Sequence, residues 1–135
     1  MRKNKEILFL LSLVMLAFAA CTPENDNTGD DRDKFTGSWT CRDSNTTTGV
    51  TDPLYSVSIS KVGVDDTIMI SNFYNLGGST FVKAVISGTS VVIPNQYDDS
   101  YLINGSGIYS NSEVKLSYSA SLGSNLSNIS AKYSR

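Results

Sequence analysis

The chain has 135 residues, with 11 basic and 13 acidic side chains, two cysteines and no histidine. This length allows one small domain, and the slightly acidic balance without a basic cluster argues against a nucleic-acid partner. Without histidine the chain lacks the commonest general acid–base group and the commonest transition-metal ligand, so we predict no enzymatic activity, no cofactor and no metal site.

Residues 1–20 have the organisation of an export signal. Three basic residues among the first five positions precede an apolar run, Ile7 to Ala20, which is too short to span a bilayer. The hexapeptide LAFAAC at residues 16–21 resembles the lipobox of bacterial lipoproteins, although Phe18 stands where that box usually has Leu, Val or Ile. The resemblance implies that Cys21 becomes the lipidated first residue. An ordinary signal peptide cleaved near Cys21 is the alternative.

Residues 21–34 are predicted to form an acidic, flexible tether. This segment contains no apolar side chain larger than proline after Cys21, so it cannot bury enough area to fold. The acids Glu24 and Asp26, close behind Cys21, resemble the surface-export signals of lipoproteins of the Bacteroidota. We therefore expect a protein held to the outer membrane of the cell envelope by its lipid, with display on the cell surface favoured over the periplasmic side.

Residues 35–135 are predicted to form one all-β domain. Apolar and polar residues alternate with a period of two in short segments separated by Gly, Asn, Asp and Ser, and no window shows a helical stripe. The two-residue period is clearest in Glu113–Ala120. Eight such strands favour an antiparallel up-and-down barrel over a two-sheet sandwich. The predicted strands are Ser38–Asp43, Tyr55–Ser60, Thr67–Tyr74, Thr80–Ser87, Thr89–Ile93, Tyr101–Ser110, Glu113–Ala120 and Ile129–Ser134.

A Gly-x-Trp element opens the first of these strands, within the sequence FTGSW at residues 35–39. This element and the domain that follows it resemble the small lipocalin-like, calycin-type lipoproteins of the Bacteroidota. The resemblance implies that Trp39 closes one end of the barrel and that a basic residue near the last strand, here Arg135, packs over it. We expect the domain to be a monomer.

Asn72, Phe73, Tyr74 and Asn75 form the densest aromatic and amide cluster, where a strand runs into a Gly-Gly loop. As a ligand-binding site, they would place an aromatic ring at the barrel mouth, with an amide as polar handle for an apolar ligand or a sugar. In the alternative interpretation, the two rings complete the core and an asparagine bonds the loop backbone.

Several other residues could carry chemistry, but for most of them we predict a structural role. We expect Cys41 to be a buried, unreactive cysteine, and Gly105 and Gly107 to allow bends or close backbone approach. The acidic pairs at residues 65–66 and 98–99 are predicted to lie in solvated turns and not to form a catalytic couple. Asp66-Thr67-Ile68 resembles the acceptor sequence for O-glycosylation in exported Bacteroidota proteins, which makes Thr67 a candidate sugar carrier.

The function that the sequence predicts is non-catalytic binding of a small apolar or glycan ligand inside a lipid-anchored, lipocalin-like barrel. The alternative is a surface interaction or structural lipoprotein with a filled barrel that contacts another protein. An open interior lined by aromatic and aliphatic side chains would favour the first function, and a packed interior would favour the second.

Overall fold

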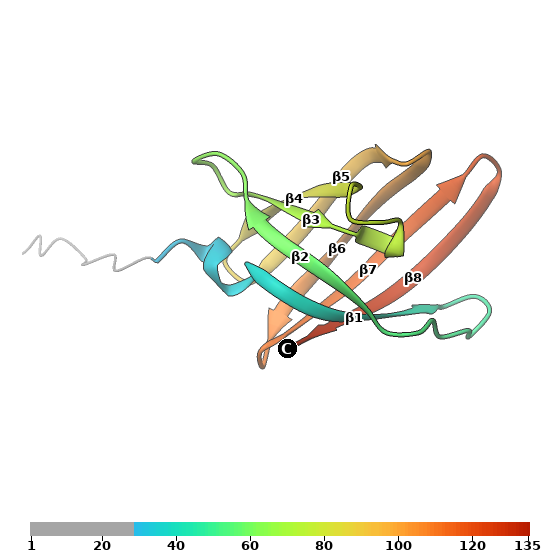
Figure 1. The fold of residues 1–135 in the computed structure, drawn as a ribbon, viewed down its shortest axis with the longest axis horizontal. Coiled ribbons are helices and arrows are strands. Elements are labelled where there is room, and N and C mark those ends of the chain that lie inside the picture. The colour runs from blue at the N-terminus through green and yellow to red at the C-terminus, as the bar shows by residue number, and fades with distance from the viewer. Residues whose placement is uncertain (1–28) are drawn as a thin grey trace, which may run out of the picture.

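The computed structural model describes residues 29–135, which form a closed barrel of eight antiparallel strands in up-and-down order (Figure 1). The predicted eight-stranded barrel is thus confirmed. The predicted signal peptide, the predicted lipidation residue Cys21 and the first part of the predicted tether lie outside the described residues. The elements are the 3-10 helices η2 (Asp31–Lys34) and η3 (Phe73–Asn75) and the strands β1 (Gly37–Asn45), β2 (Tyr55–Lys61), β3 (Thr67–Ser71), β4 (Phe81–Ser87), β5 (Ser90–Asp98), β6 (Tyr101–Ser110), β7 (Glu113–Leu122) and β8 (Asn125–Ser134).

The barrel has two distinct ends, which we call the η2 end and the η3 end. At the η2 end lie η2, the β2–β3 loop, the β4–β5 and β6–β7 turns and Arg135. The η3 end carries η3 together with the β1–β2 loop and the β5–β6 and β7–β8 turns (Figure 1). The described chain enters and leaves at the η2 end.

The hairpin turns explain several strand boundaries. Asn111 and Ser112 have φ angles of 53° and 61°, so this predicted two-residue turn has the left-handed pair that matches the twist of the strands. Asp99 and Ser100 form a similar turn, with φ angles of 44° and 73°. The predicted turn at 97–100 is therefore too long, because β5 continues through Asp98.

Asp98 also corrects the predicted solvation of the acidic pair at residues 98–99. It is 6% exposed, and its Oδ2 atom has no hydrogen-bond partner. Burial raises the pKa of Asp98, an effect that the backbone N–H of Phe81 opposes. Asp99, in the turn, is exposed as expected.

The predicted strand Thr67–Tyr74 ends earlier in the structure, at Ser71. Asn72 adopts a left-handed conformation with φ 58°. This conformation lies outside the β region, so the strand ends at the residue before it. Phe73 to Asn75 then form η3 across the end of the barrel. The predicted strand thus combined β3 with a segment that closes the barrel.

The barrel interior is filled by its own side chains. Alternate residues of each strand point inward, and every buried apolar side chain exposes 4% or less of its surface. A cavity large enough for a ligand would give its lining side chains accessible surface, even when sealed from bulk water. The near-zero exposures therefore indicate a packed core. The largest fully buried side chains include Trp39, Tyr133, Phe35 and Phe73.

Gly105 and Gly107 allow β6 to approach β7 closely, as predicted. A Cβ atom added at Gly105 would lie 2.5 Å from the Cβ of Tyr118, and one at Gly107 would lie 2.2 Å from the carbonyl oxygen of Lys115. No real side chain tolerates such distances. The two glycines therefore leave the space that Tyr118 and Leu116 occupy.

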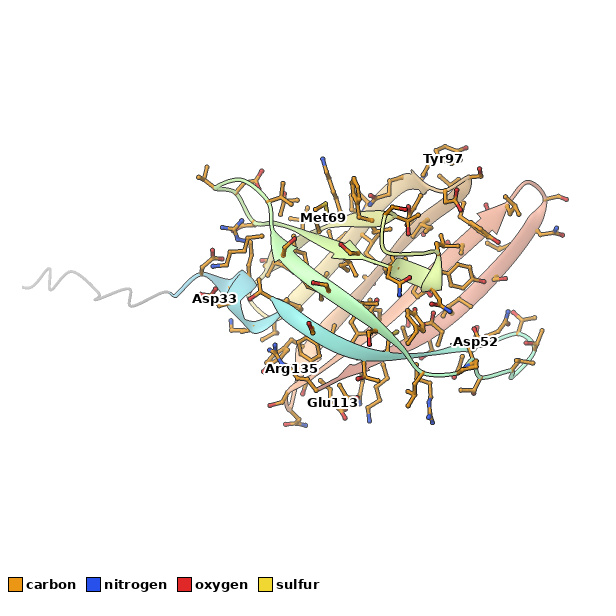
Figure 2. All side chains as sticks on the ribbon, viewed as in Figure 1. Asp33, Asp52, Met69, Tyr97, Glu113 and Arg135 are labelled. Carbon is orange, nitrogen blue, oxygen red and sulfur yellow. The ribbon has the colours of Figure 1, made fainter. Side chains whose placement is uncertain are left out.

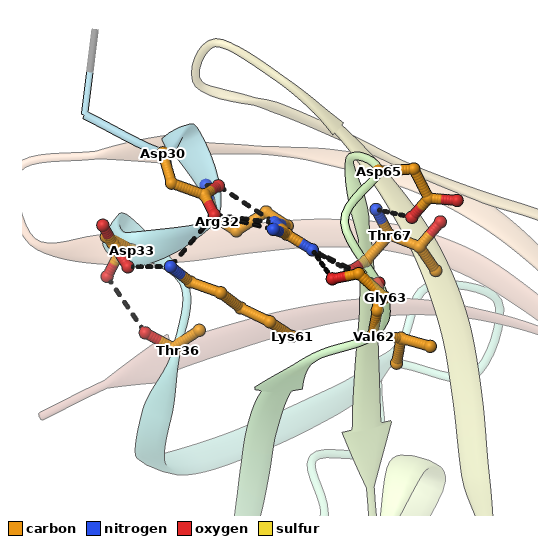
Figure 3. Close-up of polar contacts among 9 residues, drawn as sticks. All are labelled: Asp30, Arg32, Asp33, Thr36, Lys61, Val62, Gly63, Asp65 and Thr67. Carbon is orange, nitrogen blue, oxygen red and sulfur yellow. Dashed lines mark hydrogen bonds and ion pairs between the residues drawn. The ribbon is translucent and has the colours of Figure 1, made fainter. Parts of the chain in front are cut away.

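The end of the predicted tether belongs to the folded domain (Figure 3). Arg32 in η2 is 7% exposed and donates from Nη1 to the carbonyl oxygens of Val62, Gly63 and Thr67 at 3.2 to 3.3 Å. Its Nη2 pairs with Asp30 at 2.7 Å. Sequence composition places residues 30–34 in the tether because they contain no apolar side chain. One guanidinium nevertheless fixes them to the β2–β3 loop.

No helix within residues 29–135 is long and apolar enough to cross a bilayer.

Candidate functional site

The four residues of the predicted ligand site lie together at η3. The rings of its two aromatic residues, Phe73 and Tyr74, point into the core. Phe73 is fully buried, with its ring centroid 4.6 Å from that of Tyr118. Tyr74 is half-buried and makes edge contacts with Tyr101 and Tyr118, at centroid distances of 5.5 and 5.9 Å. The aromatic rings close the η3 end and leave no open mouth.

The two asparagines serve the loop backbone or solvent. Asn72 donates from Nδ2 to the carbonyl oxygen of Ser56, and its Oδ1 accepts from the amide of Gly77, both at 2.8 Å. Asn75 is exposed. This arrangement matches the core-closing interpretation of the segment.

The η3 segment contains backbone strain. Asn72, Tyr74 and Asn75 have φ angles of 58°, 53° and 56°. Asparagine tolerates the left-handed region, but the conformation costs a residue such as Tyr74 about 1 kcal/mol or more. The contacts of its ring with Tyr101 and Tyr118 offset this cost.

A polar cluster lies inside the barrel beneath η3, centred on Asp43 of β1. Asp43 is 1% exposed, and its Oδ2 accepts from the hydroxyls of Tyr55 at 2.6 Å and Tyr118 at 2.7 Å. The thiol of Cys41 donates to Oδ1 at 3.4 Å. Burial raises the pKa of Asp43, and the two tyrosine hydroxyls, which favour the carboxylate, partly oppose this effect.

This cluster was not predicted from the sequence, although a signal for it exists. Asp43 ends the predicted strand Ser38–Asp43 and shares the parity of Trp39 and Cys41, the side that faces the core. A carboxylate in step with two buried apolar residues indicates an inward-facing charge. No comparable pattern marks its tyrosine partners, which look like ordinary core aromatics.

Cys41 and Tyr133 complete the interior cluster. Cys41 is a free, fully buried cysteine, which confirms its predicted structural role. Burial raises its pKa, as does the nearby carboxylate of Asp43, so the thiol stays protonated at neutral pH. The pKa of Tyr133 is likewise raised by burial, and its hydroxyl has no hydrogen-bond partner.

The chemistry available to this cluster is limited. The carboxylate of Asp43, the phenol of Tyr118 and the protonated thiol of Cys41 are buried, whereas Tyr55 is partly exposed. Within residues 29–135, no grouping of three or more acidic or cysteine side chains has the arrangement of a metal site. The cluster instead ties β1, β2 and β7 together across the interior.

The η2 end is closed by the predicted pair. The guanidinium carbon of Arg135 lies 3.9 Å from the centroid of the Trp39 ring. Arg135 also donates to the carbonyl oxygens of Thr36 at 2.8 Å and Lys34 at 3.0 Å, and the indole of Trp39 donates to the Phe35 carbonyl at 2.6 Å. A stacked cation thus fixes the segment before β1 to the end of the chain.

Thr67, the predicted O-glycosylation residue, is the first residue of β3 and lies half-buried on the outward-facing side. Its amide donates to Oδ1 of Asp65 at 3.1 Å. The hydroxyl of Thr67, and to a lesser extent this backbone contact, holds the pKa of Asp65 below its ordinary value.

Hollows and an apolar patch lie on the outer wall of the barrel within residues 29–135. Val85 and Val92 are register partners with Ile108 nearby on β6, and each is about half exposed. Tyr97, which is 74% exposed, points away from the barrel (Figure 2).

One hollow of about 360 Å³ is lined by Thr46, Asn104, Gly105, Ser117, Tyr118, Ser119, Asn128 and Ile129, and another of about 280 Å³ by Thr40, Arg42, Leu54, Lys132 and Ser134.

Comparison with known proteins finds no family model, no curated protein and no solved structure that matches this chain.

Proposed function

We propose that this chain is a lipid-anchored, non-catalytic protein of the cell envelope whose filled barrel is a rigid scaffold that contacts a partner through its outer wall. The observation that carries the proposal is the packed interior, in which buried apolar side chains expose 4% or less. A barrel filled by its own side chains has its recognition surfaces outside. This proposal keeps the filled barrel and the surface interaction of the alternative function in the sequence analysis, without restricting the partner to a protein.

The lipid anchor is supported by the sequence at residues 16–21. Its test is metabolic labelling of the full chain with a fatty acid in a bacterial host that processes lipoproteins. We expect label on the wild type, none on Cys21→Ser and undiminished label on Cys41→Ser. Labelling of Cys21→Ser, or an unlabelled wild type, would exclude the anchor.

Membership of the lipocalin-like lipoproteins is likewise a proposal. It is supported by the combination of an eight-stranded up-and-down barrel, the Gly37-Ser38-Trp39 opening of β1 and the stacking of Arg135 on Trp39. In a protein anchored at Cys21, the η2 end would face the membrane, because the described chain enters there. The η3 end would then face outward, and the side wall would be free along its whole length.

The filled-barrel proposal is tested by native mass spectrometry of the purified protein after incubation with extracts of host lipids and glycans. We expect no apolar ligand to be retained by the wild type. A stoichiometric lipid-like mass that Phe73→Ala abolishes would contradict the proposal. Leu126→Ala, which changes a side chain that is 62% exposed, is the control for a general loss of apolar surface.

Ligand binding inside the barrel is the second candidate function, and one observation favours it. The η3 segment that closes the barrel is strained at Tyr74, and in the interior the buried hydroxyl of Tyr133 has no hydrogen-bond partner. Displacement of η3 would relieve the strain and open the interior to a small ligand with a polar group. The same mass-spectrometry experiment distinguishes the two candidates, because only this function predicts a retained lipid-like mass that Phe73→Ala abolishes.

A further inference from the structure

Three cationic side chains stand side by side on the outer wall. Arg42 of β1 is the register partner of Lys132 of β8, and Lys132 is also the register partner of Lys115 of β7. All three are exposed and occupy outward-facing positions. Neighbouring strands lie about 4.8 Å apart, so these residues, which we call the cationic row, span about 10 Å.

The row is an unfavourable arrangement for the sheet itself. Like charges on register partners repel each other and destabilise the pairing. Lys132 pairs with Glu113 at 2.7 Å, but within residues 29–135 Arg42 and Lys115 form no ion pair. The chain has more acidic than basic residues and yet places three bases together. Such a concentration of positive charge has a physical use if an anion binds there.

A hollow beside the row supplies further hydrogen-bond donors. Thr40 and Ser134 are register partners two residues along the strands from Arg42 and Lys132, so two hydroxyls and two cations border the same hollow of about 280 Å³. Leu54, 56% exposed, forms its apolar side. The guanidinium fork of Arg42 and these donors suit a tetrahedral oxyanion, which accepts several hydrogen bonds at once.

From this geometry we infer that the hollow binds a sulfate or phosphate ester group of an acidic glycan. Leu54 packs against the carbon skeleton of the sugar, and Lys115 attracts the next anionic group along the chain. The row is narrow, and membrane-binding clusters usually contain about four to eight basic residues, so a linear glycan fits better than a lipid surface. This inference rests on the proposed use of the outer wall and names the ligand class for it.

The test is calorimetric titration of the purified protein at physiological salt. The probes are a sulfated oligosaccharide, a phosphorylated oligosaccharide, their uncharged parent, and phosphatidylcholine vesicles with and without phosphatidylglycerol. We expect binding of the charged oligosaccharides only. Arg42→Gln should weaken it about tenfold or more, since it removes charge-assisted hydrogen bonds. Lys83→Gln, which removes an exposed cation of β4 outside the row, should leave the affinity within about twofold.

Several results would overturn the inference. Equal weakening by Lys83→Gln would indicate only general attraction between charges, and binding of anionic vesicles without binding of either charged oligosaccharide would exclude the glycan. Absence of any binding by the wild type would show that the hollow is not an anion-binding site. Weaker binding by Arg42→Gln would not be caused by unfolding. This variant relieves repulsion between like charges and should unfold at the same or a higher temperature than the wild type.

Amide chemical shifts in the same titration separate failure of this inference from failure of the proposed function. We expect shifts on β1 and β8 around the hollow. A ligand that instead shifts Phe73 and Tyr118 enters the barrel, which would contradict the filled-scaffold proposal and this inference alike. Absence of binding would overturn only this inference, because native mass spectrometry tests the scaffold separately.

Discussion

Tyr118 donates its hydroxyl to Asp43 Oδ2 at 2.7 Å across the barrel interior, although the two residues are 75 positions apart in the chain. The ring of Tyr118 also packs against Phe73, so one side chain connects the buried carboxylate to the segment that closes the η3 end. Changes at either residue therefore report on the integrity of the interior.

Replacement of Asp43 by asparagine should change how stability depends on pH. Burial raises the pKa of Asp43 in the folded protein above the ordinary value of 3.8. The folded state therefore binds this proton more tightly than the unfolded state. The resulting stabilisation is present at low pH and is lost as pH rises from 3.8 through the raised pKa. Each tenfold difference in proton affinity between the two states corresponds to about 1.4 kcal/mol.

Urea unfolding of both proteins from pH 4 to pH 8 measures this effect. The difference in unfolding free energy between Asp43→Asn and the wild type should move in favour of the variant as pH rises, because asparagine stays neutral. The comparison cancels the other carboxylates. A difference that is constant across this range would show that Asp43 titrates normally.

Substitution of Gly105 by alanine should destabilise the barrel by about 2–3 kcal/mol, since the added methyl group overpacks the wall against Tyr118. Gly78→Ala is the matched control, because a Cβ atom there meets nothing within 4 Å and its φ is not left-handed. The control should be neutral or more stable by about 0.5 kcal/mol. Equal unfolding midpoints in urea for the two variants would refute the close approach of β6 and β7.

Arg32→Lys should loosen the β2–β3 loop while keeping the charge. Lysine lacks the fork that reaches both Asp30 and the three loop carbonyls, so we expect a loss of about 1–3 kcal/mol. Hydrogen exchange at the Val62 amide, which donates to the Thr67 carbonyl, should accelerate. Lys34→Gln changes a partly exposed side chain of the same helix, which pairs with Asp31 and does not contact the β2–β3 loop, so it should leave that exchange rate unchanged. Unchanged exchange in Arg32→Lys would mean that residues 30–34 do not hold the loop.

Arg135→Ala should expose Trp39, the sole tryptophan of the chain. Loss of the stacked guanidinium and its two hydrogen bonds should cost about 1–2 kcal/mol. The fluorescence emission of Trp39 should shift to longer wavelength. The indole ring should also become accessible to an added quencher. Arg42→Ala, on the outer wall, provides the control. The contact is refuted if emission and quenching are the same in Arg135→Ala as in the wild type.

The two-residue period of the sequence was sufficient to predict the barrel, because each strand has one buried and one solvated face. The prediction for Tyr101–Ser110 matches β6 in both bounds. β5 extends five residues beyond its predicted end at Ile93, because the register shifts between Ile93 and Gln96 and breaks the alternation. The Gln96 side chain bonds the backbone of Lys83 there, a contact that no local pattern encodes.

The candidate sites were harder to predict, because each depends on residues far apart in the chain. The aromatic cluster at residues 72–75 indicated a feature of the fold, but whether it opens or closes the barrel depends on Tyr101 and Tyr118. The cationic row is recognisable only once the register pairs Arg42 with Lys132 and Lys132 with Lys115. Spacing along one strand carries no information about such neighbours.

The contact of Arg135 with the carbonyl of Lys34 brings the last residue of the chain to the segment that precedes β1. A short peptide between residue 135 and residue 30 would therefore join the two ends without crossing the barrel. New ends opened in the exposed β1–β2 loop, near Asp52 at the opposite pole, would yield a circularly permuted protein with all eight strand pairings intact (Figure 2). The same geometry makes that loop a point where a foreign epitope can be inserted far from the η2 end.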